Sequence, residues 1–223
     1  MQDISKLCAD SLRAFFGEDY GIKLGAAHAH ELVAANFGYE SRAALLADTK
    51  YPLSNLKEAE TVVSPPLDVL ELRIKRLLGE SPALPDAPSV SKRVYSVLVA
   101  EKWILGTAFS SFEELATLTA KEHLDRRWKK FGLNSTSIKL DVDVDVDLGA
   151  DSVLLTALMS RPPSEQVQER LREMKVSIKI SRVAANLGYG KPESYESRYT
   201  GGARKMSVPD DVVWTAQGWL LHP

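Results

Sequence analysis

Apolar residues recur at helical spacing in the first third of the chain. A spacing of three or four residues places side chains on one side of a helix. Residues 4–15 and residues 67–78 each carry one such apolar stripe and therefore each predict a helix. A further helix is expected over residues 112–131, because Ser111 and Glu114 have the spacing of a capping box.

One stretch alternates apolar and polar residues without a break. Residues 138–148 place aliphatic side chains at every second position, with four aspartates two residues apart between them. This period of two predicts a β-strand with an apolar face and an acidic face. A calcium loop starting at Asp141 is excluded, because Val146 and Ser152 stand where that loop needs glycine and glutamate. We interpret the acidic row as a solvated face whose like charges discourage pairing between sheet edges.

Proline-rich stretches indicate how the chain is divided. Each proline fixes one backbone dihedral and lacks an N–H donor, so clusters of proline favour linkers. Residues 94–105 are apolar with little period, so a strand and a buried helix both stay open there. The expected segments are an N-terminal helical module at 1–63, a middle α+β part at 64–160 with a proline-rich linker at 79–90, and a basic helical module at 161–223.

Self-comparison reveals a repeated turn. The residues Val-Ala-Ala-Asn-Phe-Gly-Tyr at 33–39 return as Val-Ala-Ala-Asn-Leu-Gly-Tyr at 183–189, with a single difference. Small residues followed by a glycine suit a helix that ends in a left-handed residue and then turns into a second helix. We therefore expect helix, turn and helix twice. The fold class expected is α+β, predominantly helical, with two helix-turn-helix-like modules around a middle part that holds at least one alternating strand.

Both copies carry resemblances to known proteins. Residues 180–199, with Leu187-Gly188-Tyr189 and Pro192 opening the next segment, resemble the second helix-turn-helix of AraC-type transcription regulators. The resemblance implies a recognition helix that enters the major groove of DNA. Residues 22–46 resemble a small helical module of uncharacterised bacterial proteins, some of which carry a glyoxalase-related label. The His and Glu ligands that a glyoxalase metal site takes from several strands have no counterpart in this chain.

Charge supports a nucleic-acid hypothesis for the C-terminal part. The chain has 223 residues and a formal net charge of −2, yet residues 161–206 carry 10 basic and 5 acidic groups, a net charge of +5. We therefore predict a bacterial, cytoplasmic DNA-binding or regulatory protein whose partner is double-stranded DNA. In the first copy of the repeat, Ser41 and Arg42 are weaker candidates for contacts with nucleic acid. The candidate nucleic-acid contacts are Arg182, Lys191, Ser194, Ser197, Arg198, Arg204 and Lys205, with Glu193 beside them.

A second hypothesis is a protein-interaction or adaptor module, because a helix–glycine–helix corner also serves as a purely structural or protein-docking element. Enzymatic function finds no support in the sequence. Cys8 is the lone cysteine and lies on an apolar stripe, and His28 and His30 lack the His-Glu-x-x-His spacing. No catalytic residue, cofactor or metal is expected, and no apolar run is long enough for a membrane span. The oligomeric state is not indicated.

The nucleic-acid hypothesis predicts binding to random duplex DNA that weakens steeply with salt, because phosphate contacts release counterions. Charge reversal at Lys191 and Arg198 should lower the affinity further. A gel-shift at two salt concentrations measures both effects. Absence of a shift at low salt, or a shift that salt does not change, contradicts the hypothesis.

Overall fold

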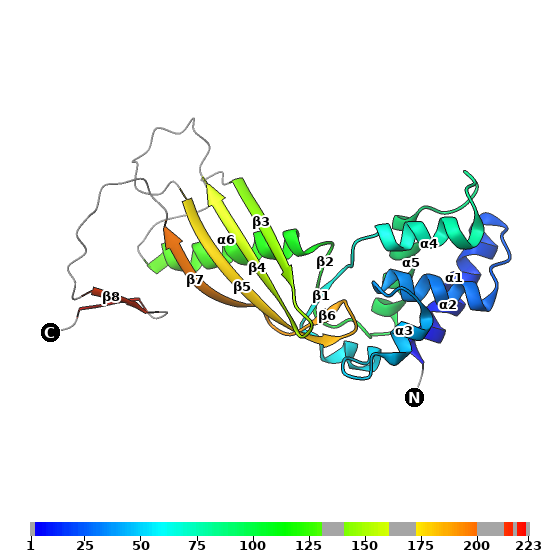
Figure 1. Cartoon of the computed structure of the whole chain (residues 1–223), viewed down its shortest axis with the longest axis horizontal. Coiled ribbons are helices and arrows are strands. Elements are labelled where there is room, and N and C mark those ends of the chain that lie inside the picture. The colour runs from blue at the N-terminus through cyan, green and yellow to red at the C-terminus, as the bar shows by residue number, and fades with distance from the viewer. Residues whose placement is uncertain (1–2, 131–140, 161–172, 200–211, 216–217, 222–223) are drawn as a thin grey trace. The chain divides into compact units, whose positions relative to one another are not determined.

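The structure of the protein is a computed structural model that describes residues 3–130, 141–160, 173–199, 212–215 and 218–221 (Figure 1). Contacts divide the chain into two units. The first unit combines Met1–Phe112 with Ile180–Lys191, and the second combines Glu113–Lys179 with Pro192–Pro223. The two units are defined by contacts between residues, whereas the three expected segments are divided at proline-rich stretches. The units therefore do not test the segments, which stay a prediction.

Helices pack around one apolar core in the first unit. The apolar stripe of residues 4–15 faces that core, and the stripe of residues 67–78 does the same, so both expected helices are confirmed. The first helix begins where the carboxylate of Asp3 accepts from two backbone amides, and it ends at Gly21 in the left-handed conformation. The helices are α1 (Ile4–Tyr20), α2 (Ala26–Asn36), α3 (Arg42–Ala47), the 3₁₀ helix η1 (Leu53–Glu58), α4 (Asp68–Leu78) and α5 (Ala87–Ala100).

The structure decides the apolar stretch at 94–105 in favour of a helix with one buried side, on which Val94 and Leu98 lie, whereas Val99 is exposed. Helix α5 continues to Ala100, and the chain then turns at Lys102, which has a φ of 57°. Trp103 and Ile104 follow the turn and are buried in the core. The stretch has little visible period because both its helical part and the segment after the turn contribute to the core.

Short strands complete the first unit. Strand β1 (Thr61–Val63) pairs in parallel with β2 (Thr107–Phe109) and antiparallel with β6 (Gly188–Tyr189). The last residues of β5 (Glu173–Ala184) pair with β6, with a register shift between Arg182 and Ala184. Residues from three distant parts of the sequence thus meet in one small sheet.

The second unit is a helix against an antiparallel sheet. Helix α6 (Phe112–Lys130) confirms the helix expected from residue 112, and its predicted last residue lies outside the described ranges. Strand β3 (Asp141–Leu148) confirms the alternating strand, of which residues 138–140 lie outside them. The other strands are β4 (Ser152–Ser160), most of β5, β7 (Glu193–Tyr199), and the separate pair β8 (Val212–Thr215) and β9 (Gly218–Leu221).

Helix α6 lies along one face of this curled sheet (Figure 1). Every second residue of β4 from Val153 to Met159 is buried, as are Val176 and Ile178 on β5. Leu115 and Leu124 are among the buried residues of α6. The sheet therefore has one apolar face covered by the helix and a second face without a covering helix among the described residues.

The expectation of a predominantly helical fold is wrong. The described residues form a seven-stranded sheet in the order β2-β1-β6-β5-β4-β3, with β7 beside β5. Residues 173–181 of β5 alternate polar and apolar side chains as β3 does, so a period of two favours a strand there as well. Strand β4 is a run of apolar and small residues, which a local pattern does not separate from a buried helix, and long-range strand pairing decides its conformation.

Two helix-turn-helix modules are expected. The structure contains the first, and the prediction of the second is wrong. Helix α2 ends with Gly38 at a φ of 75°, and the Ser41 hydroxyl accepts from the Ala44 amide at the start of α3. In the second copy, β5 ends at Ala184 and β6 begins at Gly188, so the same residue types form strand, turn and strand. The end of β5 pairs with β6 across this turn, and the backbone of the turn also bonds to distant segments of the first unit, at Tyr51 and in β1.

We predict opposite effects for alanine at two glycines. In Gly38→Ala, the positive φ is strained and the new Cβ would lie 3.3 Å from Cβ of Pro65, so the free energy of unfolding should fall by about 1–3 kcal/mol. In Gly17→Ala, inside α1 with open space around it, that free energy should rise by up to about 1 kcal/mol. Urea unfolding measures both, and a Gly38→Ala variant as stable as the wild type contradicts this account.

Candidate functional site

Strand β3 forms an open edge of the sheet. It is the last strand in the strand order, and β4 is its neighbour on one side; no described strand pairs with its other side. In an antiparallel pair, every second residue of an edge strand directs its N–H and C=O away from the neighbouring strand. This edge of β3 therefore offers backbone donors and acceptors over an eight-residue strand.

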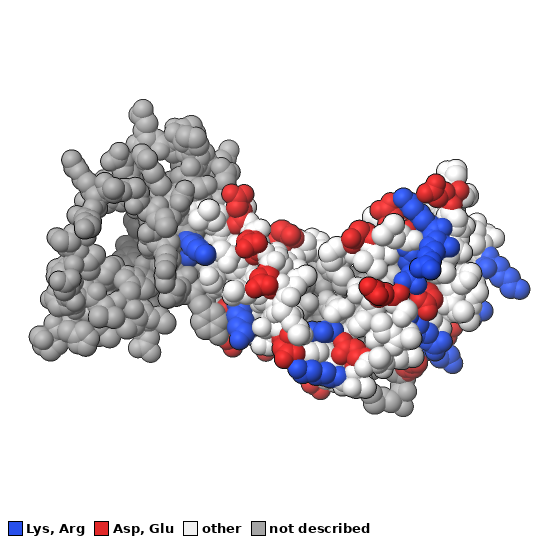
Figure 2. All heavy atoms as spheres, in the orientation of Figure 1, with Lys and Arg blue, Asp and Glu red and all other residues white. Residues whose placement is uncertain are grey.

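An acidic row lies on the uncovered face along this edge. Asp143, Asp145 and Asp147 are exposed, and their side chains form no ion pair or hydrogen bond with any described residue. Figure 2 shows acidic side chains in a row over β3. Their partners across the ladder are Leu158, Thr156 and Leu154 of β4. These carboxylates are therefore available to a cationic partner.

A row of valines lies on the opposite face of the same strand. Val142, Val144 and Val146 are half-buried, whereas the β4 residues paired with them, Met159, Ala157 and Leu155, are fully buried. The valines are covered on the β4 side and open toward the sheet edge. Within the described part of the sheet, the apolar face that packs on α6 is thus fully covered at β4 and only partly covered at β3.

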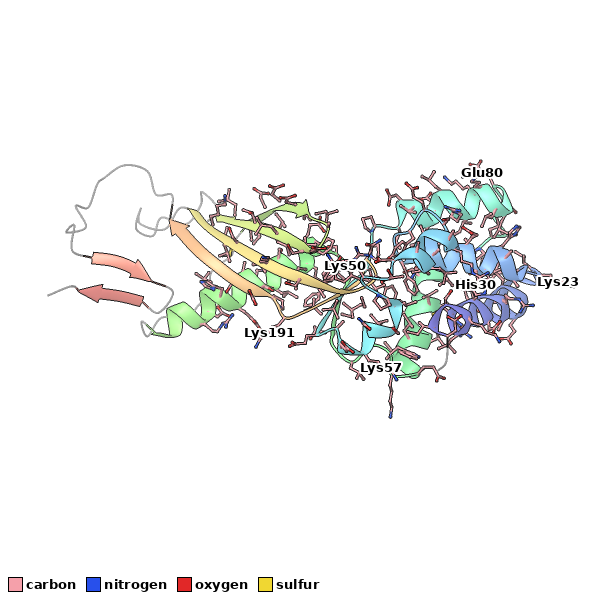
Figure 3. All side chains as sticks on the ribbon, turned by 60° about the horizontal axis from the view of Figure 1, so that its bottom comes forward. Lys23, His30, Lys50, Lys57, Glu80 and Lys191 are labelled. Carbon is pink, nitrogen blue, oxygen red and sulfur yellow. The ribbon has the colours of Figure 1, made fainter. Side chains whose placement is uncertain are left out.

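The structure separates the residues predicted to contact nucleic acid. Lys191 is exposed after β6, and its side chain extends away from the ribbon (Figure 3). Ser194 lies in β7 with its Oγ 3.0 Å from Nδ1 of His123 on α6. The remaining positions are Ser197 and Arg198 on β7, whose side chains are not described, and Arg204 and Lys205, which lie outside the described residues. The recognition helix expected after Gly188 is a strand, so the helical premise of the hypothesis is wrong.

Arg182 is held inside the first unit. Its guanidinium donates to the carboxylate of Asp48 and to Oη of Tyr39, the latter at 2.9 Å, and lies 4.7 Å from the ring centre of Tyr51. The side chains of Arg182 and Asp48 are each only 16% exposed. Arg182 therefore serves as a structural anchor in this arrangement, with its charge matched by Asp48.

Tyr39 completes this cluster. Its hydroxyl donates to Oδ2 of Asp48 at 2.5 Å. Burial raises the pKa of Tyr39, and the hydrogen bond to Asp48 raises that pKa further. The phenol therefore stays protonated at neutral pH and keeps its role as a donor.

The two copies of the repeated sequence contact each other. The side-chain amide of Asn186 donates to the carbonyl of Gly38 at 3.2 Å, and Arg182, directly before the second copy, reaches Tyr39 at the end of the first. The backbone amide of Ala185 donates to the carbonyl of Tyr51 at 2.8 Å. Self-comparison finds both copies, but nothing in it indicates that they meet.

Titratable groups of the N-terminal helices form no catalytic arrangement among the described residues. Burial raises the pKa of the Cys8 thiol to about 12, so this thiol is protonated at neutral pH. Nδ1 of His30 lies 3.2 Å from Oγ of Ser5, and burial lowers the pKa of His30. No described group of His, Cys, Asp and Glu residues has the arrangement of a metal site.

Comparison with protein-family models, curated proteins and solved structures finds no match to this chain. Within the described ranges, no helix combines the length and the apolar composition that a bilayer crossing requires. The assignment of function therefore depends on the geometry of the molecule itself.

The Arg182 cluster makes a prediction about stability. Arg182→Gln leaves the carboxylate of Asp48 poorly solvated and without its cation, so the free energy of unfolding should fall by about 2–4 kcal/mol. Lys179→Gln, an exposed position on the same strand, should change it by less than about 0.5 kcal/mol. Urea unfolding compares the two variants. Equal stability of both would mean that Arg182 does not anchor the second copy.

Proposed function

We propose that this protein is a protein-interaction module that binds an extended, basic segment of a partner along the free edge of β3. The observation that carries the proposal is that, among the described residues, one strand combines a backbone edge without a neighbouring strand, an incompletely covered valine row and an acidic row without ion pairs. Each of the three favours a feature of the same ligand.

The backbone edge favours strand addition. An extended peptide beside β3 continues the hydrogen-bond ladder, which is a common mode of peptide recognition. The backbone hydrogen bonds give affinity independent of sequence, so the side chains on the two faces must supply selectivity. A segment of about seven residues matches the length of β3.

The valine row favours apolar residues at every second position of the ligand. Residues opposite each other in adjacent strands share a face of the sheet. Apolar side chains opposite Val142, Val144 and Val146 would cover the open side of these valines. Burial of this apolar surface stabilises the complex by roughly 25 cal/mol for each Å² removed from water.

The acidic row favours Lys or Arg at the alternate positions. Basic residues opposite Asp143, Asp145 and Asp147 form cross-strand pairs of opposite charge, each worth roughly 0.2–1 kcal/mol. A second copy of β3 would place aspartate opposite aspartate, which disfavours pairing between identical edges. The charge pattern therefore supports a different, basic partner.

Nucleic-acid binding stays an untested prediction from the sequence. Lys191 is exposed, yet no observation of the described residues groups it with a second predicted contact on one surface. The acidic row along β3 also repels a polyanion at short range. For these reasons the geometry favours the protein-interaction hypothesis.

The proposal predicts selective binding of an alternating basic peptide. A fluorescein-labelled Lys-Val-Lys-Val-Lys-Val-Lys peptide should bind at least tenfold more tightly than a peptide with the same four lysines followed by the three valines. Fluorescence anisotropy at low salt measures both affinities. Amide hydrogen exchange should slow at alternate residues of β3 when the first peptide is bound, because new backbone hydrogen bonds form there.

A matched pair of variants separates the acidic row from general charge. The triple variant Asp143→Asn, Asp145→Asn and Asp147→Asn should lower the affinity for the alternating peptide about tenfold, since three cross-strand ion pairs are lost. The control Asp10→Asn, Glu18→Gln and Asp19→Asn removes the same charge from α1 and should leave the affinity within twofold. Equal affinity for both peptides, or equal effects of both triple variants, contradicts the proposal.

A further inference from the structure

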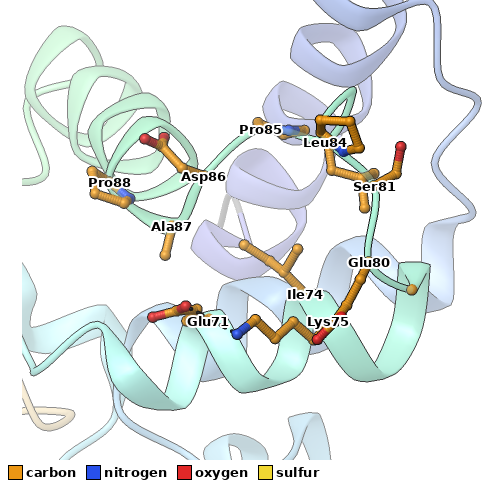
Figure 4. A pocket seen from close by; sticks show the side chains of 12 residues that line it. Glu71, Ile74, Lys75, Glu80, Ser81, Leu84, Pro85, Asp86, Ala87 and Pro88 are labelled. Atoms are coloured by element: carbon orange, nitrogen blue, oxygen red, sulfur yellow. Dashed lines mark ion pairs between the residues drawn. The ribbon is translucent and has the colours of Figure 1, made fainter.

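A cavity of about 620 Å³ lies in the first unit, between α4 and the chain that connects α4 to α5 (Figure 4). All residues that line the cavity lie between positions 71 and 88. These residues are the predicted proline-rich linker together with the end of the helix before it and the beginning of the helix after it. The cavity is independent of the β3 edge, because all of its lining residues belong to the first unit.

The floor of the cavity is apolar. Ile74 projects from α4 into the space, and Pro85 and Ala87 face it from the connecting chain and the start of α5 (Figure 4). All three are buried, and Leu84 beside them is half-buried. Prolines restrict the backbone of this connection before any ligand binds, which lowers the entropic cost of binding.

The rim of the cavity is acidic. It carries the carboxylates of Glu71, Glu80 and Asp86 and the ammonium of Lys75, a net charge of −2. Nζ of Lys75 lies 3.2 Å from Oε1 of Glu71, so this ammonium is already paired. The side chain of Glu80 forms no ion pair or hydrogen bond with any residue that the structure describes.

Asp86 keeps its negative charge while it caps α5. Its carboxylate accepts a hydrogen bond from the backbone amide of Ser89 at 2.9 Å. Hydrogen bonds from the side chain and then the backbone of Ser89 lower the pKa of Asp86. A carboxylate at a helix start is also stabilised by the helix dipole. The rim thus carries two acidic side chains, Glu80 and Asp86, that form no ion pair with a residue in the described part of the chain.

We propose that this cavity binds an alkylammonium group, a positively charged nitrogen carried on a chain of methylene groups. Methylenes fit the floor formed by Ile74, Pro85 and Ala87, and positively charged nitrogen fits the acidic rim, on which Glu80 and Asp86 lie at opposite ends of the cavity. An anionic ligand is repelled by the rim, and a wholly apolar ligand would desolvate the carboxylates without compensation. The same chemical group occurs in a free polyamine and in the side chain of lysine.

Binding is tested on the full chain with spermidine as the probe, by chemical-shift changes of ¹⁵N-labelled protein at low salt. We expect shifts concentrated at residues 71–88, and none with butane-1,4-diol, which has a short methylene chain but no charge. Nα-acetyl-lysine N-methylamide separates the two sources of the group. Tighter binding of spermidine indicates a free polyamine, and equal or tighter binding of the lysine derivative indicates a lysine side chain.

Paired variants identify the carboxylates. Glu80→Gln with Asp86→Asn should weaken spermidine binding at least fivefold, and asparagine preserves the cap on α5 because it caps helices as well as aspartate does. Glu80→Gln alone, which leaves the cap unchanged, should weaken binding at least twofold. The control Glu18→Gln with Asp19→Asn removes the same charge from α1 and should leave the affinity within twofold. Shifts spread over all acidic surfaces, equal loss in the control, or no binding of either amine overturns the proposal.

Discussion

The anchoring of residues 182–189 in the first unit is the interaction on which the rest of the structure depends. Arg182 meets Asp48 and Tyr39 across more than 130 positions of sequence, in surroundings with little water. Backbone hydrogen bonds from Ala185 to Tyr51 and from Val63 to Leu187 hold the segment on both sides of the turn. Since β5 enters this segment directly, the anchor also fixes where the long strand of the second unit ends.

This anchor explains why one repeated sequence adopts two conformations. The residues Val-Ala-Ala-Asn form the end of a helix in the first copy, where the surrounding chain supplies hydrogen-bond partners four residues away. In the second copy the partners are β1, the carbonyl of Tyr51 and the antiparallel neighbour β6. Small side chains allow both conformations, so the neighbouring segments decide between them.

The two proposed binding sites, the edge of β3 and the cavity beside α4, both contain apolar side chains that the rest of the structure leaves partly uncovered. At β3, the described part of the sheet ends before its valine row is fully covered, and Asp143, Asp145 and Asp147 on the other face form no ion pair with a described residue. At the connection between α4 and α5, the proline-rich chain and α4 border a cavity with an apolar floor. Both features select cations, one through a row of carboxylates on a strand and the other through carboxylates on the rim of a pocket.

The sequence alone determined the elements whose pattern is local. The stripes of α1 and α4, the start of α6, the unbroken alternation of β3 and the turn at Gly38 each depend on residues within a few positions, so each could be predicted. The acidic face of β3 and the proline-rich connection beside the cavity were visible in the same way. Tertiary structure decided that β3 lies at an edge, that the linker borders a cavity, and that the second copy of the repeat is extended. The physical reason is that edge position, cavity shape and the conformation of small-residue segments depend on which distant groups pair and pack, and a one-dimensional pattern does not contain those partners.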